Sequence, residues 1–221
     1  SNSGFGYLVC TFRSGFSLQF RAYNDGIAYR FETAMKDSLT VKNEISDILF
    51  PAGTTTWFPR ESSMMSHNEN TFTYGKLDTI MNNHLASLPA LFKTGEVNVL
   101  ITESGIEDYP GMWLRGAGNG KLTGIWPQYP EQERLNSDRN LRVTKTKDYI
   151  AHTAGTRTFP WRTFVISPND GGLIESDLVY KLAAPARLTE PDWIKPGKVA
   201  WDWWNANNIY GVDFRSGLNN E

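Results

Sequence analysis

The 221-residue sequence contains a single cysteine, Cys10, so it forms neither an intrachain disulfide nor a cysteine-rich metal site. It also contains no run of 18 apolar residues long enough to span a membrane as a helix. Charge of one sign is not in excess either, because 22 Lys and Arg face 24 Asp and Glu, for a formal net charge of −2. This balance excludes the strongly basic surface that binds nucleic acid or an anionic membrane.

Aromatic residues, in contrast, are abundant. They make up 13% of the chain, with eight Trp and 19 Gly. This composition favours an all-β domain with extended loops over a helix bundle. The length suffices for one large β domain or two small ones with a core that needs no disulfides.

The clearest local signal is a β-hairpin. Residues 16–23 and 27–31 alternate apolar and polar side chains on either side of Asn24-Asp25-Gly26, and Asp-Gly supplies the positive φ that a tight turn needs. Further strands are expected at 39–41, 96–102, 112–114 and 159–167, and Pro160 suggests that the last of these is entered at a sheet edge. Residues 43–49 fit a helical turn or a strand equally, 61–70 an exposed loop, and 77–88 only a short initial helix.

A tryptophan-rich run lies near the end of the sequence. Trp201, Trp203 and Trp204 follow the Pro196-Gly197 turn, and this pattern predicts a buried strand at Val199–Trp204. A Trp face stacks on a pyranose and an Asn amide hydrogen-bonds its hydroxyls, so Trp203 and Asn205 suit a carbohydrate site. A tryptophan-rich core strand explains the run equally well. The polar residues 219–221 resemble a helix N-cap, so we expect the first half of a βα unit with the remainder outside this sequence.

Four stretches occur in an order that resembles glycoside hydrolase family 97, the bacterial α-glucosidase and α-galactosidase family. They are Phe20-Arg21-Ala22-Tyr23-Asn24-Asp25-Gly26-Ile27-Ala28-Tyr29-Arg30-Phe31, Ile101-Thr102-Glu103 with Asp108-Tyr109-Pro110-Gly111-Met112, Pro160-Trp161-Arg162, and Trp193-Ile194-Lys195-Pro196-Gly197-Lys198 leading into Trp201–Asn205. The resemblance implies an antiparallel β-supersandwich of the mutarotase-like kind at 1–183, with its first strands missing. It also implies a linker at 184–192, and at 193–221 the first strand and helix start of a truncated (β/α)8 barrel.

The resemblance also implies particular site residues. The family's catalytic carboxylates lie on later barrel strands, so no catalytic residue is assigned in this sequence and the fragment is expected to be inactive alone. Glu69 matches a sandwich-loop ligand to calcium, an ion that takes six to eight oxygen ligands. Trp203 matches a family position where an aromatic side chain contacts the sugar, and Asn205 is a candidate for a contact to a sugar hydroxyl. Glu103 is expected to be a structural, hydrogen-bonded carboxylate instead of a ligand.

As a whole, the resemblance implies that the chain is a fragment of a calcium-dependent α-glycosidase, bacterial and periplasmic or secreted. Its expected partners are an oligosaccharide substrate and its own catalytic barrel. Two alternatives stay open. One is a non-catalytic carbohydrate-binding or structural sandwich. The other is a mutarotase-like enzyme with a histidine acid and a glutamate base, which the scattered positions of His67, His84 and His152 disfavour.

Overall fold

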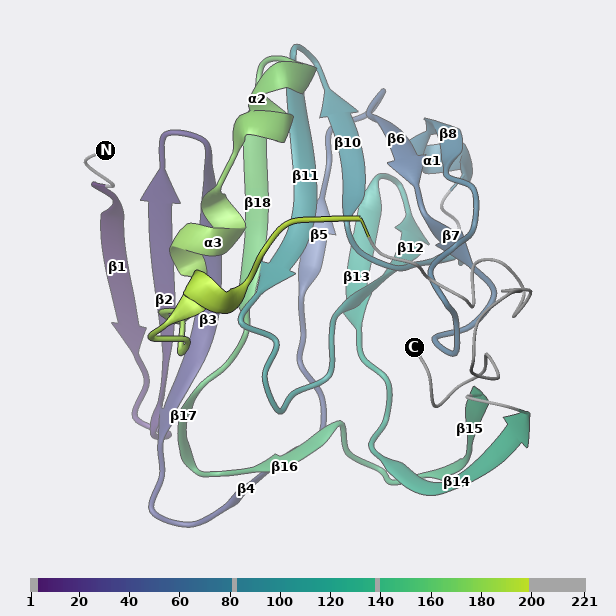
Figure 1. The fold of residues 1–221 in the computed structure, drawn as a ribbon. Helices are drawn as coiled ribbons and strands as arrows, with labels where there is room; N and C mark the ends of the chain where they lie inside the picture. Colours follow the sequence, from purple (N-terminus) through teal and green to yellow (C-terminus); the bar gives the residue numbers. More distant parts are fainter. Residues whose placement is uncertain (1–3, 81–82, 138–139, 199–221) are drawn as a thin grey trace, which may run out of the picture. The chain divides into compact units, whose positions relative to one another are not determined.

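The computed structural model describes residues 4–80, 83–137 and 140–198, and in these the chain is mainly β (Figure 1). Every strand pairing among them is antiparallel, which confirms the mainly β, antiparallel part of the expected fold class. The chain divides into two units, one ending at Ala184 and the other beginning at Pro185, and each is described by itself. The barrel strand expected at Val199–Trp204 lies outside the described residues.

The first unit is built on a large sheet with the strand order β1-β2-β3-β18-β11-β10-β6-β8, with β17 paired to β3 (Figure 1). Strands that are far apart in the sequence therefore lie side by side at its centre, where β18 lies between β3 and β11. The strands are β1 (Gly6–Thr11), β2 (Phe16–Tyr23), β3 (Gly26–Ala34), β6 (Thr55–Phe58), β8 (Thr73–Lys76), β10 (Ala90–Thr94), β11 (Val97–Ser104), β17 (Thr156–Thr158) and β18 (Trp161–Ser167).

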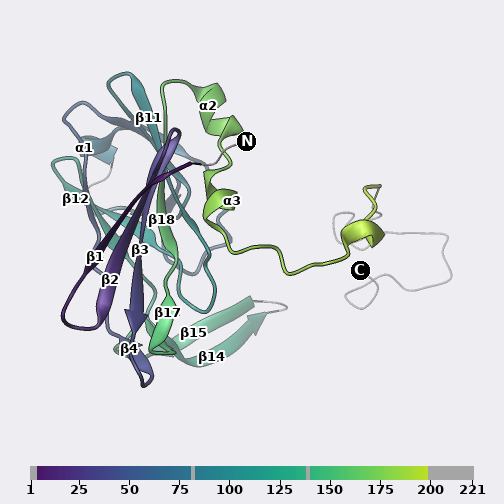
Figure 2. The same ribbon diagram turned by 90° about the vertical axis from the view of Figure 1, so that its left-hand side faces the viewer.

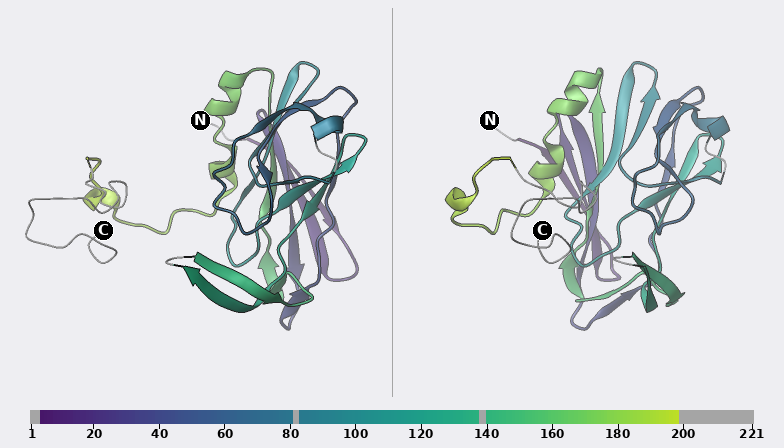
Figure 3. Two further views of the ribbon diagram at one scale, coloured as in Figure 1. Left: turned by 90° about the vertical axis from the view of Figure 1, so that its right-hand side faces the viewer. Right: turned by 45° about the vertical axis from the view of Figure 1, so that its right-hand side comes forward.

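A second sheet has the order β5-β13-β12-β9-β7, and two further ribbons pair β14 with β15 and β16 with β4. The β14–β15 ribbon stands apart from the two sheets in Figure 3. The strands are β4 (Leu39–Val41), β5 (Asp47–Leu49), β7 (Arg60–Glu61), β9 (Leu85–Ala86), β12 (Trp113–Gly118), β13 (Lys121–Ile125), β14 (Pro130–Ser137), β15 (Asn140–Thr146) and β16 (Ala151–Thr153).

The inner faces of the two sheets pack against each other to form the main core. Phe92 and Ile101 of the large sheet are fully buried in one cluster with Leu114 and Leu122 of the second sheet. Such a cluster, which joins alternate residues of both sheets, defines a β-sandwich. We call the side of the large sheet that faces this core its inner face and the opposite side its outer face.

Short helices cover part of the outer face of the large sheet. Helices α2 (Asp170–Glu175) and α3 (Leu178–Leu182) follow β18 and lie on the side of the large sheet away from β12 and α1 (Leu77–Ile80) (Figure 2). Leu178 and Leu182 pack with Trp161 and Val165 in a second buried cluster. In the second unit, η1 (Pro191–Trp193) is a single 3-10 turn. None of the described helices is long and apolar enough to cross a membrane.

The predicted hairpin at residues 16–31 is confirmed as β2 and β3, joined by Asn24 and Asp25. The role of Gly26 differs in part from the expectation. Its φ is +157°, but it opens β3 where a Cβ would overlap the carbonyl oxygen of Phe164 on β18. Glycine is therefore needed here for the close approach of two strands as well as for the turn.

Three other expectations are now settled. The strand near 159–167 exists, but entry at a sheet edge is wrong, because β18 lies between β3 and β11. Pro160 precedes the strand and so removes no donor from its ladder. Residues 43–49 resolve into an extended segment that ends in β5. The short helix expected from residue 77 is confirmed as α1, which ends at Ile80.

Candidate functional site

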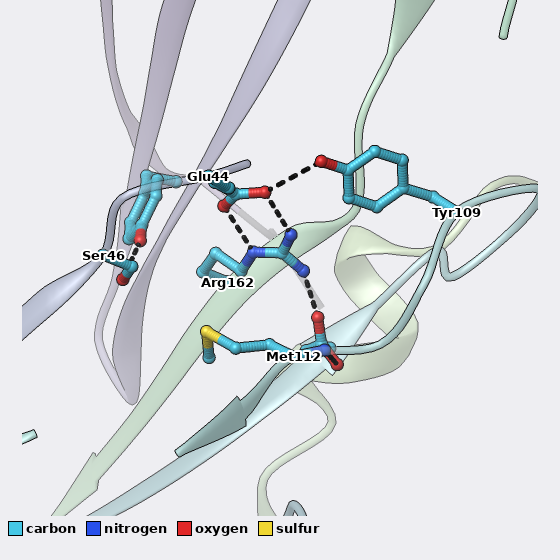
Figure 4. Close-up of polar contacts among 7 residues, drawn as sticks. Glu44, Ser46, Tyr109, Met112 and Arg162 are labelled. Carbon is cyan, nitrogen blue, oxygen red and sulfur yellow. Dashed lines mark hydrogen bonds and ion pairs between the residues drawn. The ribbon is translucent and has the colours of Figure 1, made fainter. Parts of the chain in front are cut away.

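A buried ion triad joins three segments of the sandwich. Arg162, the second residue of β18, contacts the carboxylates of both Glu44 and Glu103 (Figure 4). Its Nε and Nη2 donate to Glu44 Oε1 and Oε2 at 2.9 and 2.6 Å, and its Nη1 donates to Glu103 Oε1. Arg162 and Glu103 are directly opposite each other on β18 and β11, which places both side chains on the inner face.

The remaining polar atoms of the triad are also satisfied. The backbone N–H of Met112 donates to Glu103 Oε2 at 2.8 Å, and the Tyr109 hydroxyl donates to Glu44 Oε2 at 3.3 Å (Figure 4). The ring of Trp126 lies 5.1 Å from the guanidinium carbon. Burial raises the pKa of the Glu103 carboxyl and of the Tyr109 hydroxyl. With its hydrogen-bonding groups directed at each other, the triad fixes segments of the sandwich and presents no free acid or base.

The expected role of Glu103 as a buried, hydrogen-bonded carboxylate agrees with this geometry. The sequence reasoning missed its partners, Glu44 and Arg162. The available signal was an arginine at position 162 inside a strand whose neighbours are Trp161 and Thr163-Phe164. An arginine on the apolar face of a central strand requires a buried carboxylate, because an unpaired charge there is strongly unfavourable.

A second polar feature is the loop between β7 and β8, residues 62–72, which carries Glu69. The loop was expected to be exposed from Glu61 onward, but Glu61 itself belongs to β7 and is buried. Its Oε2 accepts hydrogen bonds from Ser66 Oγ at 2.6 Å and Asn70 Nδ2 at 2.5 Å. These bonds tie both sides of Glu69 to the sandwich, so the loop has a defined conformation although most of its residues are exposed.

Glu69 is exposed and lies next to Asn70, which lines a polar cavity of about 700 Å³. Among the described residues, no three His, Cys, Asp or Glu side chains gather as a metal site. Glu69 therefore offers at most one carboxylate to a metal within this part of the chain. Trp203 and Asn205, the predicted substrate-binding residues, lie outside the described residues. The cavity is lined by Arg60, Glu61, Ser62, Asn70, Thr71, Thr73, Asn83, His84, Leu85 and Arg115.

These features define an antiparallel β-sandwich domain held by a buried ion triad, with a pinned polar loop on its surface. The family model described as Glycosyl-hydrolase 97 N-terminal matches residues 5–185. The chain belongs to glycoside hydrolase family 97, and the match corresponds to the N-terminal domain of that family.

Two curated relatives are α-galactosidases by name. A retaining α-galactosidase of Bacteroides thetaiotaomicron is 40% identical over 226 residues, which cover 96% of this chain and 34% of that protein. A probable retaining α-galactosidase of Streptomyces bingchenggensis is 29% identical over 195 residues, which cover 85% of this chain and 26% of that protein. The chain thus spans about a third or less of the length of these relatives.

Solved structures agree on the fold. A family 97 enzyme from Pseudoalteromonas sp. strain K8 in complex with acarbose superposes with a TM-score of 0.68 at 19% identity, over 93% of this chain and 33% of that chain. A β-arabinopyranosidase superposes with a TM-score of 0.61 at 20% identity, over 81% of this chain and 30% of that chain. At these identities the likeness shows a shared sandwich, and substrate preference is a separate question.

Proposed function

We propose that the full-length protein is a retaining α-galactosidase and that this chain supplies its N-terminal β-sandwich. The observation that carries the proposal is the 40% identity to the Bacteroides thetaiotaomicron retaining α-galactosidase across 96% of the chain. The Trp201-Asp202-Trp203-Trp204-Asn205 sequence also favours the galactosidase side of the family over the glucosidase side. A retaining mechanism uses one carboxylate as a nucleophile and another as acid and base.

In this proposal the sandwich contributes no catalytic carboxylate. Two buried acids, Glu44 and Glu103, are bound to Arg162, and a carboxylate held in an ion pair inside a core has no access to a glycosidic bond. The third buried acid among the described residues, Glu61, accepts hydrogen bonds from Ser66 and Asn70. The catalytic pair is supplied by polypeptide after Glu221, in a (β/α)8 barrel that begins at 193–221. The fragment alone is therefore inactive, and its mutarotase-like supersandwich serves as a support for the barrel.

We further propose that Glu69 donates an oxygen to a calcium ion in the full-length protein. The chemistry fits, because calcium binds hard oxygen ligands and an exposed loop carboxylate is such a ligand. The bonds from Ser66 and Asn70 to Glu61 support this role, since they hold the loop on both sides of Glu69. Calcium takes six to eight ligands, so the other ligands must come from the barrel, and the ion would polarise groups of the bound sugar.

Trp203 and Asn205 complete the proposal on the substrate side. Trp203 would stack on a face of the sugar at the carboxyl end of the first barrel strand, and Asn205 would hydrogen-bond a hydroxyl. An oligosaccharide with an α-linked galactose is the proposed substrate, and the periplasm or the exterior of a bacterium is the proposed location. The substrate assignment rests on the names of the curated relatives, and the location rests on the family resemblance alone.

The proposal is tested by assaying the purified full-length protein on aryl α-galactosides and aryl α-glucosides. We expect hydrolysis of the galactoside to be preferred, and proton NMR to show the α-anomer of galactose as the first product. Preference for the glucoside, or β-galactose as the first product, would overturn the substrate or the mechanism.

A further inference from the structure

Two arginines on the outer face of the large sheet stack on one tryptophan. Arg21 on β2 is directly opposite Ala28 on β3, and Arg30 lies two residues after Ala28. Their side chains therefore lie on one face of the sheet, where Ala28 packs with Trp161. The guanidinium carbon of Arg21 is 4.8 Å from the ring centroid of Trp161, and that of Arg30 is 4.4 Å away. Two positive charges are therefore held beside one indole ring.

Further contacts fix both side chains. The ring of Phe5 lies 4.6 Å from the guanidinium carbon of Arg21, so this planar group contacts two aromatic rings, those of Phe5 and Trp161. Arg30 is held by a hydrogen bond, because its Nε donates to Gln19 Oε1 at 2.9 Å. Both guanidinium groups are thus positioned by the sandwich itself, and a ligand that binds them has little side-chain entropy to remove.

The two arginines lack the carboxylate that such a position requires. The Nε of Arg21 is buried and has no hydrogen-bond partner in the part of the chain that the structure describes. Glu32 is the one acid in the sequence of β2 and β3, and its carboxylate accepts a hydrogen bond from Gln19. The buried Arg162, in contrast, is bound by two carboxylates, which is how a protein compensates a desolvated guanidinium.

The charges on this face leave one positive charge unbalanced. Arg21 and Arg30 carry two positive charges, and Glu32 supplies one negative charge. Burial, and after it the charge of Arg21, lower the pKa of the Arg30 guanidinium, while Glu32 acts in the opposite direction. A monovalent anion bound to the two guanidinium groups would balance the charges, whereas a dianion such as phosphate would overcompensate them.

The shape of the donors selects a carboxylate among the monovalent anions. A guanidinium presents parallel N–H groups that match the two oxygens of a carboxylate, whereas a halide is a single acceptor atom. Aromatic side chains also surround the charges. Tyr7 is directly opposite Arg21 on β1 and is 55% exposed, and Phe5 is 43% exposed. Their accessible rings suit a carboxylate that is carried on an apolar stem or on the CH face of a sugar ring.

We infer that Arg21 and Arg30 form a carboxylate-binding site on the outer face of the large sheet. Two sources supply this chemistry: an acidic sugar such as galacturonate, or an aspartate or glutamate elsewhere in the full-length protein. Either source places its two oxygens on the same N–H groups. The site shares no residue with the polar cavity beside Glu69. It does not rest on the proposed α-galactosidase activity, since it is detected through stability and not through turnover.

Arg21→Met in the full-length protein tests the site, because methionine keeps an apolar side chain against Phe5 and Trp161 and removes the charge. An unpaired, partly buried guanidinium is unfavourable, so without a bound carboxylate this substitution leaves the unfolding midpoint unchanged or raises it. With a bound carboxylate, the substitution leaves that carboxylate unpaired and lowers the midpoint. Arg13→Met, at an exposed arginine in the β1–β2 turn, is the matched control.

The source of the carboxylate is identified by measuring the midpoints without ligand, with galacturonate and with galactose, which has the same ring without the carboxylate. A ligand-free midpoint that falls by at least about 2 °C in Arg21→Met, and not in Arg13→Met, supports the site and identifies an acid of the protein itself. If it does not fall, we expect galacturonate, and not galactose, to raise the midpoint of the wild type and Arg13→Met but not of Arg21→Met.

The inference is overturned if the ligand-free midpoint of Arg21→Met is at or above that of the wild type and galacturonate acts equally on all three proteins. Arg21 would then only pack on its aromatic neighbours, and any stabilisation by galacturonate would come from another site. Arg21→Lys provides a second variant, because it keeps the charge and loses the paired N–H groups. We expect it to show part of the loss seen in Arg21→Met, and wild-type behaviour of Arg21→Lys would contradict the carboxylate assignment.

Discussion

Arg162 and Glu44 are 118 positions apart in the sequence, yet they form a two-pronged ion pair in the interior of the sandwich, with donor–acceptor distances of 2.9 and 2.6 Å. The Arg162 side chain is 1% exposed and that of Glu44 5%. A pair this deeply buried is favourable only when its hydrogen bonds are complete, and here Glu103 and Tyr109 complete them. The pair connects β18 to the segment before β5 and so fixes one sheet against the other.

Removing the Arg162 guanidinium should therefore lower the stability of the folded sandwich strongly. Arg162→Met leaves Glu44 and Glu103 buried without their shared partner, and we expect the free energy of unfolding to fall by about 3–5 kcal/mol. Chemical denaturation of the wild type and the variant measures this. Arg115→Met, at an exposed position of β12, is the matched control and should change stability by less than about 0.5 kcal/mol. Similar losses in both variants would show that the triad has no special role.

Because the pKa of Glu103 is raised in the folded state, this residue makes the folding stability depend on pH. Burial makes the charged carboxylate less favourable in the folded state than in the unfolded state, where the pKa is near 4.5. The folded state therefore binds the proton more tightly. The stabilisation from this protonation is fully present below pH 4.5 and is lost as the pH rises through the raised folded-state pKa.

The variant Glu103→Gln isolates this effect, because the amide does not titrate but retains an oxygen for the Met112 N–H. The free energy of unfolding of the wild type, relative to that of Glu103→Gln, should fall as the pH rises from 4.5 through the folded-state pKa. Above that pKa the difference should stay constant. Denaturation curves at a series of pH values measure it. A difference that is constant with pH would contradict the raised pKa.

The sequence predicted the fold class and the hairpin because both depend on local patterns, such as the alternation on either side of Asn24-Asp25-Gly26. It did not predict that Pro160 introduces a central strand, because strand order depends on pairing between β3, β18 and β11, which are distant in the chain. One member of the triad was predicted, since Glu103 was assigned a structural role without its partners Glu44 and Arg162. The burial of Glu61 was missed because its own neighbours in sequence are polar.

The proposed calcium ligand gives a further prediction. In the full-length protein, Glu69→Ala should reduce α-galactosidase activity at limiting calcium, and excess calcium should restore part of it, because one of six to eight ligands is lost. Glu96→Ala, at an exposed glutamate in the β10–β11 turn, is the control and should behave like the wild type. Titrations of activity against free calcium make the comparison. Full activity of Glu69→Ala at calcium levels that limit the wild type would show that Glu69 is not a ligand.

The proposed division of labour between the sandwich and the barrel is tested by comparing two proteins on one substrate, p-nitrophenyl α-galactopyranoside. We expect the full-length protein to hydrolyse it with a higher kcat/KM than the corresponding glucoside, and the 221-residue chain to show no turnover with or without calcium. Turnover by the repurified 221-residue chain would show that the catalytic groups lie within this sequence. A full-length protein inactive on both substrates would contradict the proposed α-glycosidase function itself.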